Sequence, residues 1–168
     1  KTLSKGYSPE SPENDAKRLA LDIHGKIPLL YGIYGLTDSI TLRWKCQFNE
    51  NSKTPSFYNV FPELNHNEIE GWDTNHEFGY NFFVVILRSE DEAENISRQI
   101  EITKTILSDR VGGIKEAWGK GNGRLARMLS LIYLGDFVSY YLAILNGIDP
   151  TPVKNIEKLK KSLVISNY

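Results

Sequence analysis

The sequence predicts an α/β domain in which a parallel sheet is covered by helices on both faces. Apolar, strand-like segments at residues 27–33, 56–61, 81–87 and 114–118 alternate with segments of helical periodicity. No hairpin turn joins two of the strand-like segments, so crossovers must connect parallel strands. Residues 125–146 are apolar nearly all round a helix, which requires contacts on more than one side.

The composition indicates one globular domain. The chain has 168 residues, of which 40% are hydrophobic and 24% charged. A net charge of −1 without a basic stripe disfavours nucleic acids and anionic membranes as partners. The lone Cys46 has no partner for an internal disulfide, which favours a reducing, cytoplasmic compartment. No uninterrupted apolar run approaches the roughly 20 residues that a membrane-spanning helix needs, and no signal peptide is visible.

The first elements follow from capping and spacing signals. Residues 1–14 are polar and contain two prolines, so we expect an arm or linker before a single domain at 15–168. Asn14 or Asp15 can cap a helix through about residue 24, which Gly25 ends. Four apolar residues at helical spacing form its inner face: Ala16, Leu19, Ala20 and Ile23.

The segment that follows predicts the first crossover. Residues 27–33 form a short apolar run of the kind found in buried parallel strands. Asp38 or Ser39 is placed to cap a helix that ends at about residue 49. A second strand is expected at 56–61, and a short helix at 65–72.

The second half repeats the alternation. Residues 81–87 are the clearest strand and are expected at the centre of the sheet, and an amphipathic helix follows at 90–109. Its apolar face contains Ala93, Ile96, Ile100, Thr103 and Leu107. After the strand at 114–118 and the long helix at 125–146, a Pro-rich turn precedes a last helix at 153–163. We expect its apolar residues to pack inward: Val153, Ile156, Leu159 and Leu163.

Residues 47–72 hold the most concentrated chemistry of the chain. Glu50 and His66 stand sixteen residues apart, each among Asn and other polar residues, in a segment that also carries five aromatics. Polar groups among apolar ones are costly unless they are paired, so the segment predicts a pocket or an interface. Glu50 is either a surface carboxylate at a helix end or a general base held by neighbouring amides and partial burial. His66 is either a surface histidine or a proton donor and acceptor near neutral pH.

Other candidates for chemistry carry weaker signals. His24 is expected to be a charge at a helix end and His76 a loop residue, and metal binding is not supported because no histidine pairs with another or with Cys46. Residues 119–123, GKGNG, suggest a flexible turn more than a phosphate cradle at a helix N-terminus, because they lack the Walker pattern. The lysines at 158, 160 and 161 form the solvent-exposed face of the last helix unless one of them approaches a negative charge.

Four motifs together resemble one family. They are NENSK at 49–53, FPELNHNEIEGW at 61–72, LGDFVSYYLA at 134–143 and DPTPVKNIEKLK at 149–160, and they are similar to the C-terminal half of the bifunctional phosphoglucose/phosphomannose isomerases. The resemblance covers nearly all of the chain from about Ala16. It implies a sugar isomerase (SIS) domain, which is a flavodoxin-like three-layer sandwich with a five-stranded parallel sheet. The chain resembles the second of the two SIS domains that these enzymes contain.

The resemblance also implies roles for four residues. Glu50 matches the base that moves a proton between two carbons through an enediol, and His66 matches a ring-opening histidine that comes from the other subunit of a dimer. Lys158, with Lys160 as the alternative, matches a lysine of the site, and Thr151 matches a threonine near the substrate. The implied reaction converts glucose 6-phosphate or mannose 6-phosphate to fructose 6-phosphate and requires no metal and no cofactor.

One departure from the family limits what this chain does alone. The phosphate-binding Ser/Thr loop and an arginine of the family lie in the first SIS domain, and residues 1–40 contain nothing similar. We therefore expect an N-terminal SIS domain in the intact protein and little activity in the isolated domain. A homodimer is expected, with the helix at 125–146 or the His66 region at or near the interface. The alternatives are a non-catalytic SIS module that binds a sugar phosphate and a generic flavodoxin-like domain of unrelated role.

Overall fold

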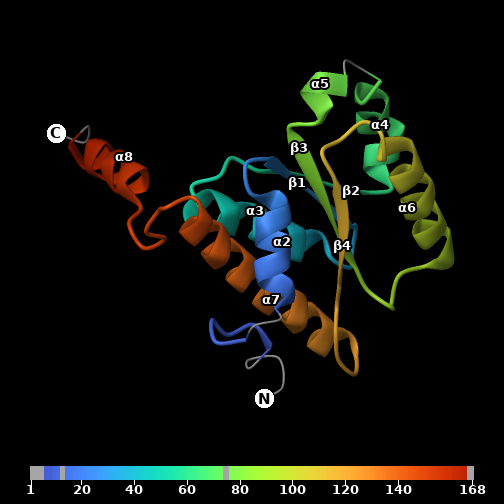
Figure 1. Cartoon of the computed structure of the whole chain (residues 1–168), viewed down its shortest axis with the longest axis horizontal. Coiled ribbons are helices and arrows are strands. Elements are labelled where there is room, and N and C mark those ends of the chain that lie inside the picture. Colours follow the sequence, from blue (N-terminus) through green and yellow to red (C-terminus); the bar gives the residue numbers. More distant parts are fainter. Residues whose placement is uncertain (1–5, 12–13, 74–75, 166–168) are drawn as a thin grey trace.

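A four-stranded, fully parallel sheet forms the centre of the molecule (Figure 1). The computed structural model describes residues 6–11, 14–73 and 76–165. The strands are β1 (Ile27–Ile33), β2 (Phe57–Phe61), β3 (Phe82–Arg88) and β4 (Ile114–Trp118), in the order β2-β1-β3-β4. The predicted α/β class and the central place of residues 81–87 are confirmed. The family resemblance implied five strands, whereas the described residues form four.

Helices cover both faces of this sheet, as predicted (Figure 1). One face carries α2 (Asp15–Ile23), α3 (Asp38–Glu50) and α7 (Arg124–Leu145). The other carries α6 (Glu94–Leu107), a 3-10 turn η1 (Glu63–His66) and the short α4 (Glu68–Gly71). A further short helix, α5 (His76–Gly79), precedes β3, where the sequence analysis expected only a loop.

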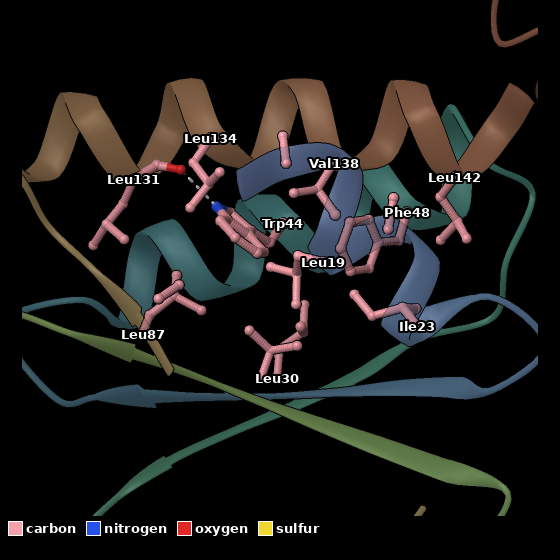
Figure 2. Packing of buried hydrophobic residues seen from close by; sticks show 14 of the residues in the cluster. Leu19, Ile23, Leu30, Trp44, Phe48, Leu87, Leu131, Leu134, Val138 and Leu142 are labelled. Atoms are coloured by element: carbon pink, nitrogen blue, oxygen red, sulfur yellow. Dashed lines mark hydrogen bonds between the residues drawn. The ribbon is translucent and has the colours of Figure 1, made fainter. Parts of the chain in front are cut away.

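The α2–α3–α7 face encloses the larger core (Figure 2). Trp44 lies at its middle, completely buried, and its indole Nε1 donates a hydrogen bond of 2.9 Å to the carbonyl oxygen of Leu131. This bond requires α3 and α7 to come close. Gly135 permits the approach, because a Cβ at that position would lie 2.3 Å from Trp44 Nε1.

The opposite face has its own core, built on alternate residues of the same strands. Leu29, Tyr31 and Ile33 of β1 point to this side, and Leu30 points to the other. Ile100 and Leu107 of α6 pack onto the layer, as the amphipathic pattern predicted. Because β1 and β3 are covered on both faces, their sequences are continuous apolar runs.

Most helix boundaries follow the predicted signals, with local differences. Asn14 caps α2, and its side-chain oxygen accepts bonds from the backbone N–H groups of Ala16 and Lys17. The residue before α3 is Thr37 rather than Asp38 or Ser39, and its hydroxyl donates to the Leu87 carbonyl instead of capping the helix. The single helix expected at 65–72 is divided at residue 67 into η1 and α4, and α6 begins at residue 94, four residues later than predicted.

The described part of the N-terminal arm packs on α7. Tyr7 is buried, its ring lies near those of Tyr133 and Phe137, and its carbonyl oxygen accepts a 2.6 Å hydrogen bond from the Tyr141 hydroxyl. Residues 1–5, 12 and 13 of the expected arm lie outside the described residues.

By length and composition alone α7 could cross a membrane, but half of its most apolar 18-residue stretch is buried inside the fold. A core helix has this character.

The last helix does not pack as expected. α8 (Lys154–Ile165) extends away from the layered body (Figure 1). Ile156, Leu159 and Leu163 remain 39%, 60% and 59% exposed, and Val153 is half-buried. The prediction that this apolar stripe packs inward is therefore wrong for this chain, because the turn at 149–152 directs the helix off the surface.

Candidate active site

Glu50 ends α3 beside a cavity of about 690 Å³. The cavity lies between the loop after α3 and the start of α8, and its lining includes Lys53, Asp149, Pro152 and Ile156. The Glu50 side chain is exposed, and among the described residues its carboxylate makes no hydrogen bond or ion pair. The carboxylate is therefore free to meet a group that enters the cavity.

The amides around Glu50 hold the loop and not the carboxylate. The side-chain oxygen of Asn49 accepts a 3.1 Å bond from the Ser56 backbone N–H, at the start of β2. The Asn51 amide donates to the Ser139 hydroxyl of α7 at 2.9 Å. The alternative in which neighbouring amides hold the Glu50 carboxylate is wrong in this chain, because these amides bond to other elements.

Lys53 joins this loop to the turn before α8. Its Nζ atom donates to the Glu50 carbonyl oxygen at 2.5 Å and to the Pro150 carbonyl oxygen at 3.1 Å. Lys53 also has a φ of +53°, in the left-handed region that residues with a Cβ rarely adopt. The two bonds hold this conformation and fix the turn against the end of α3. No local pattern predicts this role of Lys53, since the bond to Pro150 spans 97 positions.

Lys154, the first residue of α8, lines the cavity, whereas Thr151, Lys158 and Lys160 do not. The Thr151 N–H donates to the Asp149 carboxylate at 2.9 Å, and bonds from the Thr151 backbone and side chain lower the pKa of Asp149. Lys158 and Lys160 are exposed. Lys158 comes two residues after Ile156 in a helix, so it lies on the side opposite the apolar stripe. The structure thus brings Glu50 together with Lys53 and Asp149, but not with Lys158.

His66 and Glu50 lie at opposite ends of strand β2. Glu50 and Ser56 precede β2, whereas η1 and His66 follow it. Five strand residues at about 3.3 Å each separate the two ends by roughly 16 Å. His66 is exposed at the carboxyl ends of the strands, where parallel α/β sheets usually bind ligands.

The polar neighbours of His66 also have structural partners. The amide of Asn65 donates to Gln99 at 3.1 Å and its oxygen accepts from Thr103 at 2.9 Å, which fastens η1 to α6. The Asn67 side-chain oxygen accepts from the Glu68 N–H and caps α4. At both ends of β2, therefore, bonded amides fix the loop while the titratable group stays exposed.

Two buried polar clusters near this edge were not anticipated. Arg88, at the end of β3, is buried and donates to Glu92 at 2.9 Å and to Glu101 at 3.0 Å, with its guanidinium carbon 4.6 Å from the centre of the Trp118 ring. The Tyr31 hydroxyl donates to Glu68 at 2.6 Å. Glu92 is four residues from Arg88, but Glu101 is 13 positions from Arg88 and Glu68 is 37 positions from Tyr31, so local patterns do not indicate these clusters as a whole. Among the described residues, no group of three or more His, Cys, Asp or Glu side chains is placed to hold a metal ion.

Comparisons with known proteins agree on one family. The model of the bacterial phospho-glucose isomerase C-terminal SIS domain matches residues 12–163. A bifunctional phosphoglucose/phosphomannose isomerase from Caldicellulosiruptor bescii is 50% identical over 164 residues, which are 96% of this chain and 48% of that protein. A protein of the same name from Aquifex aeolicus is 42% identical over 92% of this chain and 48% of its own length. The chain thus spans about half the length of these curated relatives.

A solved structure extends the comparison to the fold. The glucose-6-phosphate isomerase like protein from Thermus thermophilus superposes with a TM-score of 0.73 at 28% identity, over 89% of this chain and 50% of that one. It agrees with the arrangement of a parallel sheet between helices. The chain belongs to the bacterial phospho-glucose isomerase C-terminal SIS domain family.

Proposed function

We propose that this chain is the second SIS domain of a sugar-phosphate isomerase that interconverts glucose 6-phosphate or mannose 6-phosphate with fructose 6-phosphate. The observation that carries the proposal is the placement of Glu50 and His66: both are exposed, and they lie at opposite ends of β2. In this proposal, neither the Glu50 end of β2 nor the His66 end forms a complete active site within one chain. The relatives are named phosphoglucose/phosphomannose isomerases, which supports the reaction class.

The proposed chemistry assigns one proton transfer to each group. His66 exchanges a proton with the ring oxygen of the sugar, so the ring opens to the free aldehyde. The Glu50 carboxylate takes the proton from C2 and returns it to C1 of the enediol. A protonated lysine stabilises the negative charge that develops on the enediol oxygens. The family resemblance assigns this role to Lys158, which lies away from Glu50 in this chain, and it assigns a substrate contact to Thr151. The protons balance without a redox partner, since the aldose and the ketose are isomers.

Two partners complete the proposed site. A preceding SIS domain supplies the phosphate-binding groups, in agreement with relatives twice as long as this chain. A second subunit supplies His66. The exposed apolar residues of α7, including Leu125 at 69% and Leu129 at 54%, are the surface we assign to the homodimer. Light scattering that finds only monomers of the intact protein at high concentration would contradict this assignment.

The decisive test substitutes Glu50 in the intact protein. Glu50→Gln removes the base and preserves the shape, so turnover of fructose 6-phosphate should fall by at least about 10²-fold. Glu70→Gln, an exposed carboxylate on α4, is the matched control. Unchanged turnover in Glu50→Gln would show that Glu50 is not the base, and absence of turnover in the native protein would favour a sugar-phosphate-binding module without catalysis.

A mixing experiment tests whether the site is shared between subunits. Glu50→Gln and His66→Gln are each expected to be inactive, but a mixed dimer contains one site with both native groups. Refolding the two variants together should restore about one quarter of the native activity, because half of randomly paired dimers are mixed and half of their sites are intact. No recovery would place both groups in one subunit's site.

A further inference from the structure

We propose that the apolar stripe of α8 is the docking surface for the SIS half that precedes this chain in the intact protein. The stripe consists of Ile156, Leu159 and Leu163, spaced three and four residues apart on one side of the helix. All three are among the exposed large hydrophobic residues. This proposal rests on the family and its domain organisation, and not on the proposed reaction.

The turn before α8 holds the helix in its projecting direction. Lys53 bonds the Pro150 carbonyl, and Asp149 accepts the Thr151 N–H, so the start of α8 is tied to the end of α3. Val153 and Ile156 also line the cavity beside Glu50. The stripe therefore begins in the cavity and continues beyond the body of the domain.

An isolated helix of this length is marginal in water. α8 has twelve residues, and helices shorter than about 12–15 residues depend on packing of an apolar face for their stability. The stripe is thus expected to meet a second apolar surface. α8 carries four lysines and one glutamate, a net charge of +3, so the complementary surface has acidic groups at its rim.

The size of the stripe favours a tethered occupant over a second copy of this chain. Twelve helical residues present a face roughly 18 Å long and 10 Å wide. That is far below the roughly 800 Å² per partner of a standard interface between separate chains. A covalently linked half reaches an effective concentration in the millimolar range, at which so small a contact suffices. The family model describes a C-terminal domain, and about half the length of the relatives lies outside this match. A preceding half of that size is the occupant that we propose.

The test is hydrogen exchange of the α8 backbone amides, 154–165, in the intact protein and in the 168-residue chain. We expect exchange at least about tenfold slower in the intact protein, at all concentrations. Leu159→Gln combined with Leu163→Gln should return α8 to the rate in the 168-residue chain, since Gln keeps the helix and removes the apolar face. Lys161→Gln, on the polar side of the same helix, should leave the slow exchange unchanged.

Four results would overturn the proposal. Equal rates in the two proteins would mean that α8 packs on its own domain or on nothing. Protection in the 168-residue chain that increases with concentration would assign the stripe to a second copy. Slow exchange that survives the double substitution would place the contact on another face of α8, and a natural protein without a preceding half would remove the occupant. Because none of these readouts is catalytic, the proposed reaction stands or fails separately.

Discussion

The Nζ atom of Lys53 lies 3.1 Å from the carbonyl oxygen of Pro150 and thereby connects the loop after α3 to the turn before α8. The same atom bonds the Glu50 carbonyl, so one side chain sets the position of Glu50 relative to Thr151 and the start of α8. Both segments border the same cavity. Lys53 is therefore a positioning residue for the proposed site.

Lys53→Met in the intact protein tests this role. Loss of both bonds frees the turn, and misplacement of the groups around the cavity is expected to lower kcat by about tenfold with a smaller change in KM. The free energy of unfolding should change by less than about 1 kcal/mol, because the bonds are exposed to solvent. Lys53→Arg, which retains donors, should recover part of kcat, and Lys45→Met, on the neighbouring helix α3, should have native kinetics. A native kcat in Lys53→Met would mean that the two hydrogen bonds of Lys53 are not needed to position the groups around the cavity.

Gly135 is expected to tolerate no side chain, although it lies inside a helix. An added Cβ would stand 2.3 Å from Trp44 Nε1, displacing a buried indole and breaking its bond to Leu131. Gly135→Ala should lower the free energy of unfolding by about 3 kcal/mol, from overpacking and a lost buried hydrogen bond. Urea denaturation followed by circular dichroism measures this.

Gly71→Ala is the matched control, since Gly71 is also helical and has open space around its Cβ position. Its stability should stay within about 1 kcal/mol of the native protein, because helix propensity is the main term that changes. Equal effects at positions 71 and 135 would show that α3 and α7 move apart easily.

The Tyr31 hydroxyl predicts a stability change at alkaline pH. Burial raises the pKa of Tyr31 above 10.0, and the charge and hydrogen bond of Glu68 raise it further. Below pH 10 both the folded and the unfolded state keep this proton. Above pH 10 the unfolded state releases it first, so the free energy of unfolding falls as pH rises.

Tyr31→Phe isolates this contribution. At pH 7 the variant should lose about 1.5 kcal/mol with its bond to the carboxylate. Between pH 10 and 12 its stability should fall less steeply than that of the native protein, by up to about 1.4 kcal/mol per pH unit. Tyr34→Phe, at an exposed position, should keep the native pH dependence. Parallel pH profiles for Tyr31→Phe and the native protein would contradict the raised pKa.

Local signals predicted most of the fold correctly. The bounds of β1 and β4 match the apolar runs at 27–33 and 114–118, and Asn14 caps α2 as expected. These features depend on neighbouring residues, since a strand covered on both faces needs a continuous apolar run and a cap bonds the next turn of backbone. The motifs around Glu50 and His66 also indicated the family that the comparisons identify.

The tertiary structure decided where these groups stand and what surrounds them. Asn49 and Asn51 lie beside Glu50 in sequence, yet they bond the start of β2 and the middle of α7. The stripe of α8 has the spacing of a core helix, yet its direction depends on a bond between Lys53 and Pro150. Periodicity and composition report which residues can be buried, but partners distant in the chain determine which of them are. For the same reason Glu50 and His66, sixteen positions apart, lie at opposite ends of one strand.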